Sequence, residues 1–361
     1  MIVKNEEAVI ERALRSAKPW ISRYVIVDTG STDKTKEIIR EVMSDVSGLV
    51  VDRPWVNFEV NRTEALEFCR GEMDWAIMLD ADDNLAGELP PASLWGRLGD
   101  EIDGIAMQIR HGEIHHQRVQ IFRVGADWCY KGVLHESPYC RSRPENAVRI
   151  AALPSTSYMV TRCEGVRSRD PEKYLKDATL LEAEHARNPT DMRTLYYLAQ
   201  SWRDAGYKKK AAQYYREYVD GSGGWAGERY IAYVNLIEMA EDPAETIVLA
   251  WKALEIAPTR LEAQYAVLKA RRLAGLPATQ QVYALGAVTQ NRKVAADIVY
   301  VNPGVYTWGF DDEFAVVAFA TGHYHEAYEA SVRAALGAPA PEMRENALRN
   351  AVASKARMST A

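Results

Sequence analysis

Several features are scarce or missing in this sequence of 361 residues, and each absence excludes a class of protein. Only four cysteines occur, without the spacing of a metal site, and they predict reduced thiols in a cytoplasmic protein. No apolar run approaches the roughly 18 residues that a membrane-spanning helix needs. The first residues also lack the basic and apolar regions of a signal peptide. We therefore expect neither a disulfide-rich secreted protein nor a membrane span.

An excess of basic residues is also missing, because 44 Lys and Arg stand against 50 Asp and Glu, a net charge of −6. That balance argues against a dedicated nucleic-acid binder. No glycine-rich phosphate loop follows the first apolar segment, which disfavours a nucleotidyltransferase. The overall composition, with 47% apolar and 26% charged residues, is ordinary for a soluble globular protein. The length predicts two domains, with three as the alternative.

Short apolar runs alternate with helix-like segments through the first half of the sequence. The runs read as strands, and the segments between them have apolar residues at helical spacing. Strands that alternate with helices predict an α/β domain with a mostly parallel sheet. Two further runs predict a pair of strands, joined by a polar connection at 111–116. The predicted strands are 2–3, 24–27, 49–51, 75–79, 105–110 and 119–123.

The predicted strand at 75–79 runs directly into three carboxylates, Asp80, Asp82 and Asp83. Open α/β sheets bind ligands at the carboxyl ends of their parallel strands. On an extended strand Asp80 and Asp82 would face the same way. Two hard oxygen donors suit Mg²⁺ or Mn²⁺, which take further ligands from phosphates. The alternative is an acidic turn that caps the next segment.

Polar residues also follow the first two predicted strands. Asp28 could accept a hydrogen bond from a nucleobase N–H or a ribose hydroxyl, or it could form an Asx-turn or helix cap. Asn5 and Glu6 follow the first strand, where Glu6 could instead cap the next helix. At the end of a later apolar segment, His135 could complete a metal shell, and Glu136 could act as a general base. A histidine that is merely hydrogen-bonded is the alternative.

Two arginines are candidates for binding phosphate. Arg62, which follows Asn61 at the start of a predicted helix, could bind a diphosphate bidentately. The alternative is an ion pair with Glu64 or Asp83. Arg167 lies on a polar stretch that could close over a phosphate-bearing ligand, or that could be a solvated linker.

From residue 170 the pattern becomes helical throughout. Apolar residues and alanines recur at helical spacing, and Gly206 and Gly322 mark turns between paired segments. This is typical of tetratricopeptide units, and Pro189 and Pro258 lie two repeats of roughly 34 residues apart. Such repeats build concave surfaces that bind extended partners.

Five motifs in order resemble glycosyltransferase family 2, of GT-A fold. They are Met1 to Glu7, Val27 to Asp33, Asn61 to Leu66, Leu79 to Asp83 and Gly132 to Glu136. The second half is similar to a helical repeat region that accompanies a subgroup of these enzymes. The resemblance implies a Rossmann-like GT-A domain with a mixed, mostly parallel sheet at 1–168. An all-α, tetratricopeptide-like helical-repeat domain would follow at 169–361.

The resemblance further implies a metal-dependent glycosyltransferase that uses a UDP- or GDP-linked nucleotide-sugar donor with Mn²⁺ or Mg²⁺. Asp82 and His135 would bind the metal, and Glu136 would be the catalytic base, with Asp83 in reserve. The helical half would hold a protein, peptide or glycan acceptor, associate with a second copy of the chain, or both. The residues implied in donor binding are Val3, Asn5, Glu6, Asp28, Asn61, Arg62, Asp80, Ala81 and Arg167.

A second hypothesis is a non-catalytic adaptor, in which a degenerate transferase domain carries a peptide-binding helical scaffold. It predicts no metal-dependent nucleotide binding. A third, a nucleotidyltransferase, would release pyrophosphate rather than a nucleoside diphosphate.

Overall fold

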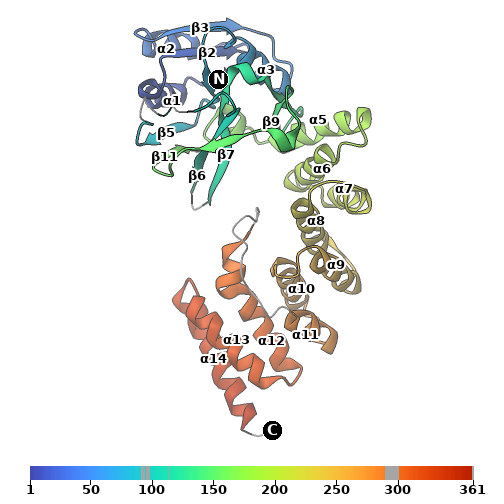
Figure 1. The fold of residues 1–361 in the computed structure, drawn as a ribbon. Coiled ribbons are helices and arrows are strands. Elements are labelled where there is room, and N and C mark those ends of the chain that lie inside the picture. The colour runs from blue at the N-terminus through green and yellow to red at the C-terminus, as the bar shows by residue number, and fades with distance from the viewer. Residues whose placement is uncertain (91–93, 95–97, 113, 289–300, 360–361) are drawn as a thin grey trace. The chain divides into compact units, whose positions relative to one another are not determined.

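The structure is a computed structural model that describes residues 1–90, 94, 98–112, 114–288 and 301–359. The chain forms two compact units, Met1–Glu184 and His185–Ala361. Strands and helices mix in the first unit, whereas the described part of the second is built from helices (Figure 1). The predicted order of an α/β region followed by an all-α region is confirmed. The units divide within α5 (Lys173–Arg187), whereas the sequence pattern changes at 168–169.

A parallel three-stranded sheet opens the first unit, in the order β1 (Ile2–Val3), β2 (Arg23–Asp28), β3 (Ser47–Asp52). Parallel neighbours need crossover connections, and α1 (Ile10–Ala17) and α2 (Thr35–Val42) supply them. The 310 turn η1 (Lys18–Trp20) extends α1. The apolar faces of both helices pack on the strands in a core that includes Val3, Ile10, Leu14, Ile26 and Ile39.

A second, mixed sheet follows, in the order β4-β7-β6-β11-β5, with β10 also paired to β6. In it β4 pairs antiparallel with β7, and β6 pairs parallel with β10 and β11. A separate hairpin joins β8 to β9, and α3 (Phe58–Glu67) precedes β4. The strands are β4 (Trp75–Ile77), β5 (Asn84–Gly87), β6 (Gly104–His111), β7 (Ile114–Arg123), β8 (Trp128–Lys131), β9 (Ser137–Cys140), β10 (Ile150–Ala152) and β11 (Ser157–Val160).

The acidic stretch departs from its prediction. Strand β4 ends at Ile77, two residues early, and its ladder neighbour β7 is antiparallel. The chain then turns, and the amide of Asp83 donates to the carbonyl of Asp80 at 3.2 Å. The prediction that Asp80 and Asp82 face the same way at a parallel sheet edge is therefore wrong, because alternation applies only to extended backbone. The acidic turn, left open as the alternative, is what forms.

The predicted strand pair is confirmed as the antiparallel hairpin β6–β7. Both strands reach further than predicted into the polar connection, within which Glu113 lies outside the described residues. Three short 310 turns, η2 (Val124–Ala126), η3 (Glu145–Ala147) and η4 (Val166–Arg169), complete the first unit. The residue before η4, Gly165, contacts the acidic turn, because its amide donates to Asp82.

Antiparallel helix pairs build the second unit. Gly206 and Gly322 both have φ +87°, the left-handed conformation that ends the first helix of a pair. The helix-turn-helix units predicted around these glycines are confirmed. None of the helices in the described residues is long and apolar enough to cross a membrane. The helices are α6 (Met192–Asp204), α7 (Lys208–Asp220), α8 (Ala226–Met239), α9 (Pro243–Ile256), α10 (Glu262–Leu273), α11 (Gln280–Ala287), α12 (Phe310–Ala320), α13 (Tyr324–Gly337) and α14 (Pro341–Met358).

Candidate functional site

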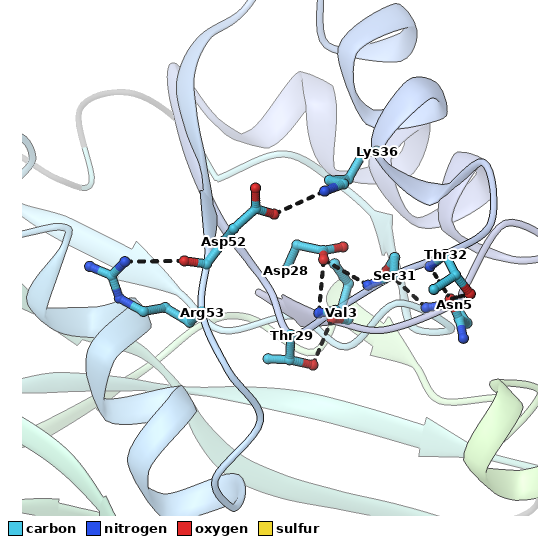
Figure 2. Close-up of polar contacts among 10 residues, drawn as sticks. Val3, Asn5, Asp28, Thr29, Ser31, Thr32, Lys36, Asp52 and Arg53 are labelled. Carbon is cyan, nitrogen blue, oxygen red and sulfur yellow. Dashed lines mark hydrogen bonds and ion pairs between the residues drawn. The ribbon is translucent and has the colours of Figure 1, made fainter.

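Asp28, the last residue of β2, is fully buried, and its two carboxylate oxygens differ. Oδ1 accepts hydrogen bonds from the amides of Gly30 at 3.0 Å and Ser31 at 2.8 Å (Figure 2). This is an Asx-turn, and Gly30 allows it because φ there is +103°. Oδ2 is buried without a hydrogen-bond partner. The Asx-turn alternative thus accounts for one oxygen, and the other has an unused capacity to accept a hydrogen bond.

The ends of the neighbouring strands lie around Asp28. The backbone oxygen of Val3 accepts from the Thr29 amide at 2.9 Å and from its hydroxyl at 3.0 Å. Asn5, in left-handed backbone at φ 57°, accepts from the Thr32 amide at 2.7 Å. On β3, Asp52 pairs with Lys36 at 3.0 Å (Figure 2). These contacts fix the loops that follow β1 and β2.

Arg62 connects the acidic turn to the loop after β8. Its side chain is 11% exposed, and Nη2 lies 2.6 Å from Asp80 Oδ1 while Nε lies 2.6 Å from Glu136 Oε1. The rings of Phe58 and Tyr130 lie 5.7 and 5.6 Å from the guanidinium carbon. Of the partners left open for Arg62, neither Glu64 nor Asp83 is used. A buried cation with two carboxylates instead holds α3, the acidic turn and residue 136 together.

Electrostatics differ between the two carboxylates that Arg62 holds. Burial would raise the pKa of Asp80, but the charge and hydrogen bond of Arg62 bring it below its usual value. For Glu136, burial exceeds the effect of Arg62, so its pKa is raised. Asp80 is therefore an anion at neutral pH.

The other two carboxylates of the turn have different surroundings. Asp82 Oδ2 accepts from the Gly165 amide at 2.9 Å, just before η4. Asp83 is buried, its Oδ1 has no hydrogen-bond partner, and burial together with the charges of Asp80 and Asp82 raises its pKa to about 7. Three carboxylates therefore gather at this turn beside the cations Arg62 and Arg118, and the raised pKa of Asp83 favours its neutral form.

Glu6 joins the same cluster from the loop after β1. Its Oε2 accepts from the Val166 amide at 3.3 Å, next to the amide that Asp82 uses. A Cβ added to Gly165 would lie 3.2 Å from Glu6 Oε1 and 3.3 Å from Asp82 Oδ2, so the glycine allows this approach. Burial is the main cause that raises the pKa of Glu6 to about 7.

Replacing Glu6 by glutamine should stabilise the protein at alkaline pH only. The folded pKa of about 7 lies above the ordinary 4.5, so the stability linked to Glu6 is present below pH 4.5 and is lost as pH rises to 7. We expect Glu6→Gln to add about 1 kcal/mol near pH 8, after discounting for solvent screening at a half-buried group, and nothing near pH 4. Urea unfolding at both pH values measures this. An equal effect at both would contradict the assignment.

Two other predicted residues, Asn61 and Arg167, are engaged within the protein. The side chain of Asn61 donates to the Pro54 carbonyl at 3.1 Å and accepts from the Val56 amide at 2.9 Å, so it shapes the loop before α3. His135 is exposed, in left-handed backbone at φ 52°. Arg167 pairs with Asp177, and its guanidinium carbon lies 5.1 Å from the Phe58 ring.

Arg118, on β7, is a residue of this site that the motifs did not indicate. Its Nε donates to Gln120 Oε1 at 2.9 Å, and Gln120 in turn donates to the Met78 carbonyl beside the acidic turn. Its charge lowers the pKa values of Asp80, Asp83 and Glu136. Ile77 pairs with Ile121, and the Met78 amide donates to the Gln120 carbonyl at 3.0 Å, so the part of β7 near Arg118 lies beside the start of the acidic turn. A correct antiparallel pairing of these strands would have found it.

Comparison with known proteins gives three kinds of similarity. Residues 1–118 match the family described as Glycosyl transferase family 2. An uncharacterized glycosyltransferase of Rickettsia bellii is 39% identical over 89 residues, 25% of this chain and 28% of the relative. A TPR repeat-containing protein of Synechococcus elongatus is 27% identical over 169 residues, 43% of this chain and 39% of the relative. The glycosyltransferase SunS of Bacillus phage SPbeta is 24% identical over 238 residues, 61% of this chain and 54% of the relative.

Among solved structures, S. aureus TarS 1-349 in complex with UDP-GlcNAc is 14% identical with a TM-score of 0.40. That similarity covers 77% of this chain and 91% of TarS 1-349. This chain spans little more than a quarter of the length of the rickettsial relatives, 28% of the first. The matched family segment includes Asp28, Arg62 and the whole acidic turn. Residues 1–118, which lie within the first compact unit, thus match glycosyltransferase family 2, and an all-helical region follows later in the chain.

Proposed function

We propose that the protein is a metal-dependent glycosyltransferase that moves a sugar from a UDP- or GDP-linked donor to a protein or glycan acceptor. The family match and the glycosyltransferase relatives support glycosyl transfer. The observation that carries the donor class is the buried, unpartnered Oδ2 of Asp28. A nucleobase N–H is the kind of donor that such an oxygen lacks.

The carboxylates of the acidic turn suit a divalent cation. Asp83 Oδ1 is buried without a hydrogen-bond partner, and the charges of Asp80 and Asp82 raise the pKa of Asp83. The cations that oppose these negative charges are Arg62, beside Asp80, and Arg118. No three His, Cys, Asp or Glu side chains among the described residues form a complete metal site. Asp82, with His135 as a second ligand, would therefore share the ion with diphosphate oxygens, as Mg²⁺ sites do. A bound ion supplies charge that stabilises the leaving nucleoside diphosphate.

Glu136 is proposed as the base that takes the acceptor proton, with Asp83 as the alternative. Support for Glu136 is its position, because Arg62 fixes its Oε1 and also holds Asp80. A carboxylate held in place by a buried guanidinium keeps its orientation when an acceptor hydroxyl arrives. Kinetics of Glu136→Gln and Asp83→Asn separate the two, since loss of kcat without a matching rise in donor KM identifies the base.

Replacing Asp28 by asparagine should weaken nucleotide binding at least tenfold without unfolding the protein. The amide oxygen can keep the Asx-turn, but an NH₂ group replaces the acceptor at Oδ2 and faces the donor of the base. Calorimetry with UDP and GDP measures the loss. The matched control is Asp52→Asn at the end of the neighbouring strand, where the side chain is 74% exposed, and it should bind normally. Equal affinity in Asp28→Asn would remove Asp28 from the donor site.

A screen of nucleotide sugars with Mn²⁺ tests the function itself. We expect release of a nucleoside diphosphate from one class of donor. Release of pyrophosphate would instead indicate a nucleotidyltransferase. Binding of peptides by the helical region, with no metal-dependent nucleotide binding, would favour the adaptor.

A further inference from the structure

Helix α14 places its larger apolar side chains away from the helix on which it packs. Its buried residues are Ala347, Ala351 and Ser354, and Ala347 clusters with alanines of α13. Leu348 and Val352, the bulky apolar residues in the middle of the helix, are 48% and 70% exposed. An amphipathic helix normally buries such side chains and exposes the small ones. The outward face of α14 therefore has the composition of a packed face.

That face has a definite order of residues. Glu345, Leu348, Val352 and Lys355 are spaced by three, four and three positions, so they form one stripe along the helix. All four are exposed. An acidic residue begins the stripe, two apolar residues occupy its middle, and a basic residue ends it.

The stripe is complementary to itself when a second copy lies antiparallel. A twofold axis between the two helices, at the level of residue 350, sets Leu348 against the partner's Val352 and Glu345 against the partner's Lys355. A parallel pair would instead bring Glu345 against its own copy and Lys355 against its own copy. Like charges across an interface are unfavourable, so the charges select the antiparallel arrangement. Opposed helix dipoles favour the same arrangement.

We propose that α14 forms an isologous, antiparallel helix pair with α14 of a second copy of this chain. In a closed twofold contact the same patch serves both subunits, and this patch meets that requirement. One helix from each copy covers less than the roughly 800 Å² per partner of a standard interface. We therefore expect a weak dimer, with a dissociation constant of about 10 µM.

Reversing the charges of Glu345 and Lys355 in the full chain tests whether the dimer forms and whether its two α14 helices are antiparallel. Glu345→Lys or Lys355→Glu alone should raise the dissociation constant roughly tenfold, because each dimer then contains two repulsive pairs. The double variant carrying both changes should return to within about threefold of the original, since the opposite charges face each other again. Sedimentation equilibrium measures the constants, and circular dichroism checks that the helices remain.

Two control variants make the result specific. Arg357→Glu reverses a charge on α14 two positions after Lys355, on another side of the helix, and it should leave association unchanged. Leu348→Glu should give a monomer, with the fold intact because the site is half exposed. The proposal is overturned by a chain that stays monomeric at about 100 µM. It is equally overturned by a dimer that Leu348→Glu leaves intact, or by one that the double variant fails to restore.

Discussion

Replacing Arg62 by methionine should lower the free energy of unfolding by about 3–5 kcal/mol at neutral pH. The change leaves Asp80 and Glu136 without the buried cation that lies 2.6 Å from each of them. Removing one partner of a buried ion pair is costly because the remaining charge keeps its desolvation penalty. Urea unfolding measures the loss. The loss should shrink in acid, where both carboxylates become protonated and neutral.

A matched control lies just before the same helix. Arg53 pairs with Glu64 at 3.8 Å and is 39% exposed, so Arg53→Met should cost less than about 1 kcal/mol. An Arg62→Met protein as stable as the original would contradict the role assigned to this ion pair. A loss that stays constant into acid would show that packing on Phe58 and Tyr130, rather than charge, is the cause.

Replacing Asp82 by alanine should lower turnover by roughly a thousandfold or more while the fold is retained. Under the proposed function the carboxylate holds the metal ion, and loss of the ion removes charge stabilisation of the leaving diphosphate. The fold should survive because Asp82 is half-buried and its carboxylate accepts one hydrogen bond, from the Gly165 amide. Rates of nucleoside diphosphate release, with Mn²⁺ varied, measure the effect.

Glu164→Gln is the control for that experiment. Glu164 directly precedes Gly165, and its carboxylate pairs with Arg12 at 2.6 Å, at about two-fifths exposure. Because it is outside the proposed machinery, its loss should leave turnover nearly unchanged. An Asp82→Ala protein that kept full activity would rule out a metal held at this turn.

Patterns among neighbouring residues predicted the features of the fold that depend on neighbouring residues, which are its helices and several of its strands. Helical spacing located the paired helices around Gly206 and Gly322. Apolar runs located β1 to β4, β6 and β7, but not β5 or β8 to β11. The order of motifs indicated Asp28 and Asp80 as candidate site residues. A pattern two or three residues long does not show where a strand ends. The sequence therefore predicts extended backbone at Asp80, where the structure has a turn.

Contacts between distant segments explain most of what the sequence left open. Arg62 meets Glu136 from 74 positions away, and Asp82 meets Gly165 from 83 positions away. Neither pairing follows from periodicity, because it depends on how the sheets are ordered and in which register. Arg118 was missed for the same reason, since antiparallel pairing of β4 with β7 is what brings it to the acidic turn.

The central claim is that Asp28 and the acidic turn together form a site for a nucleotide diphosphate and a divalent cation. Calorimetric titration of UDP and GDP into the full chain, with and without Mn²⁺, tests it most directly. We predict saturable binding of one nucleotide that strengthens at least tenfold with Mn²⁺ and loses that gain in Asp82→Ala. Absence of binding by either nucleotide, or binding that Mn²⁺ does not affect, would contradict the claim.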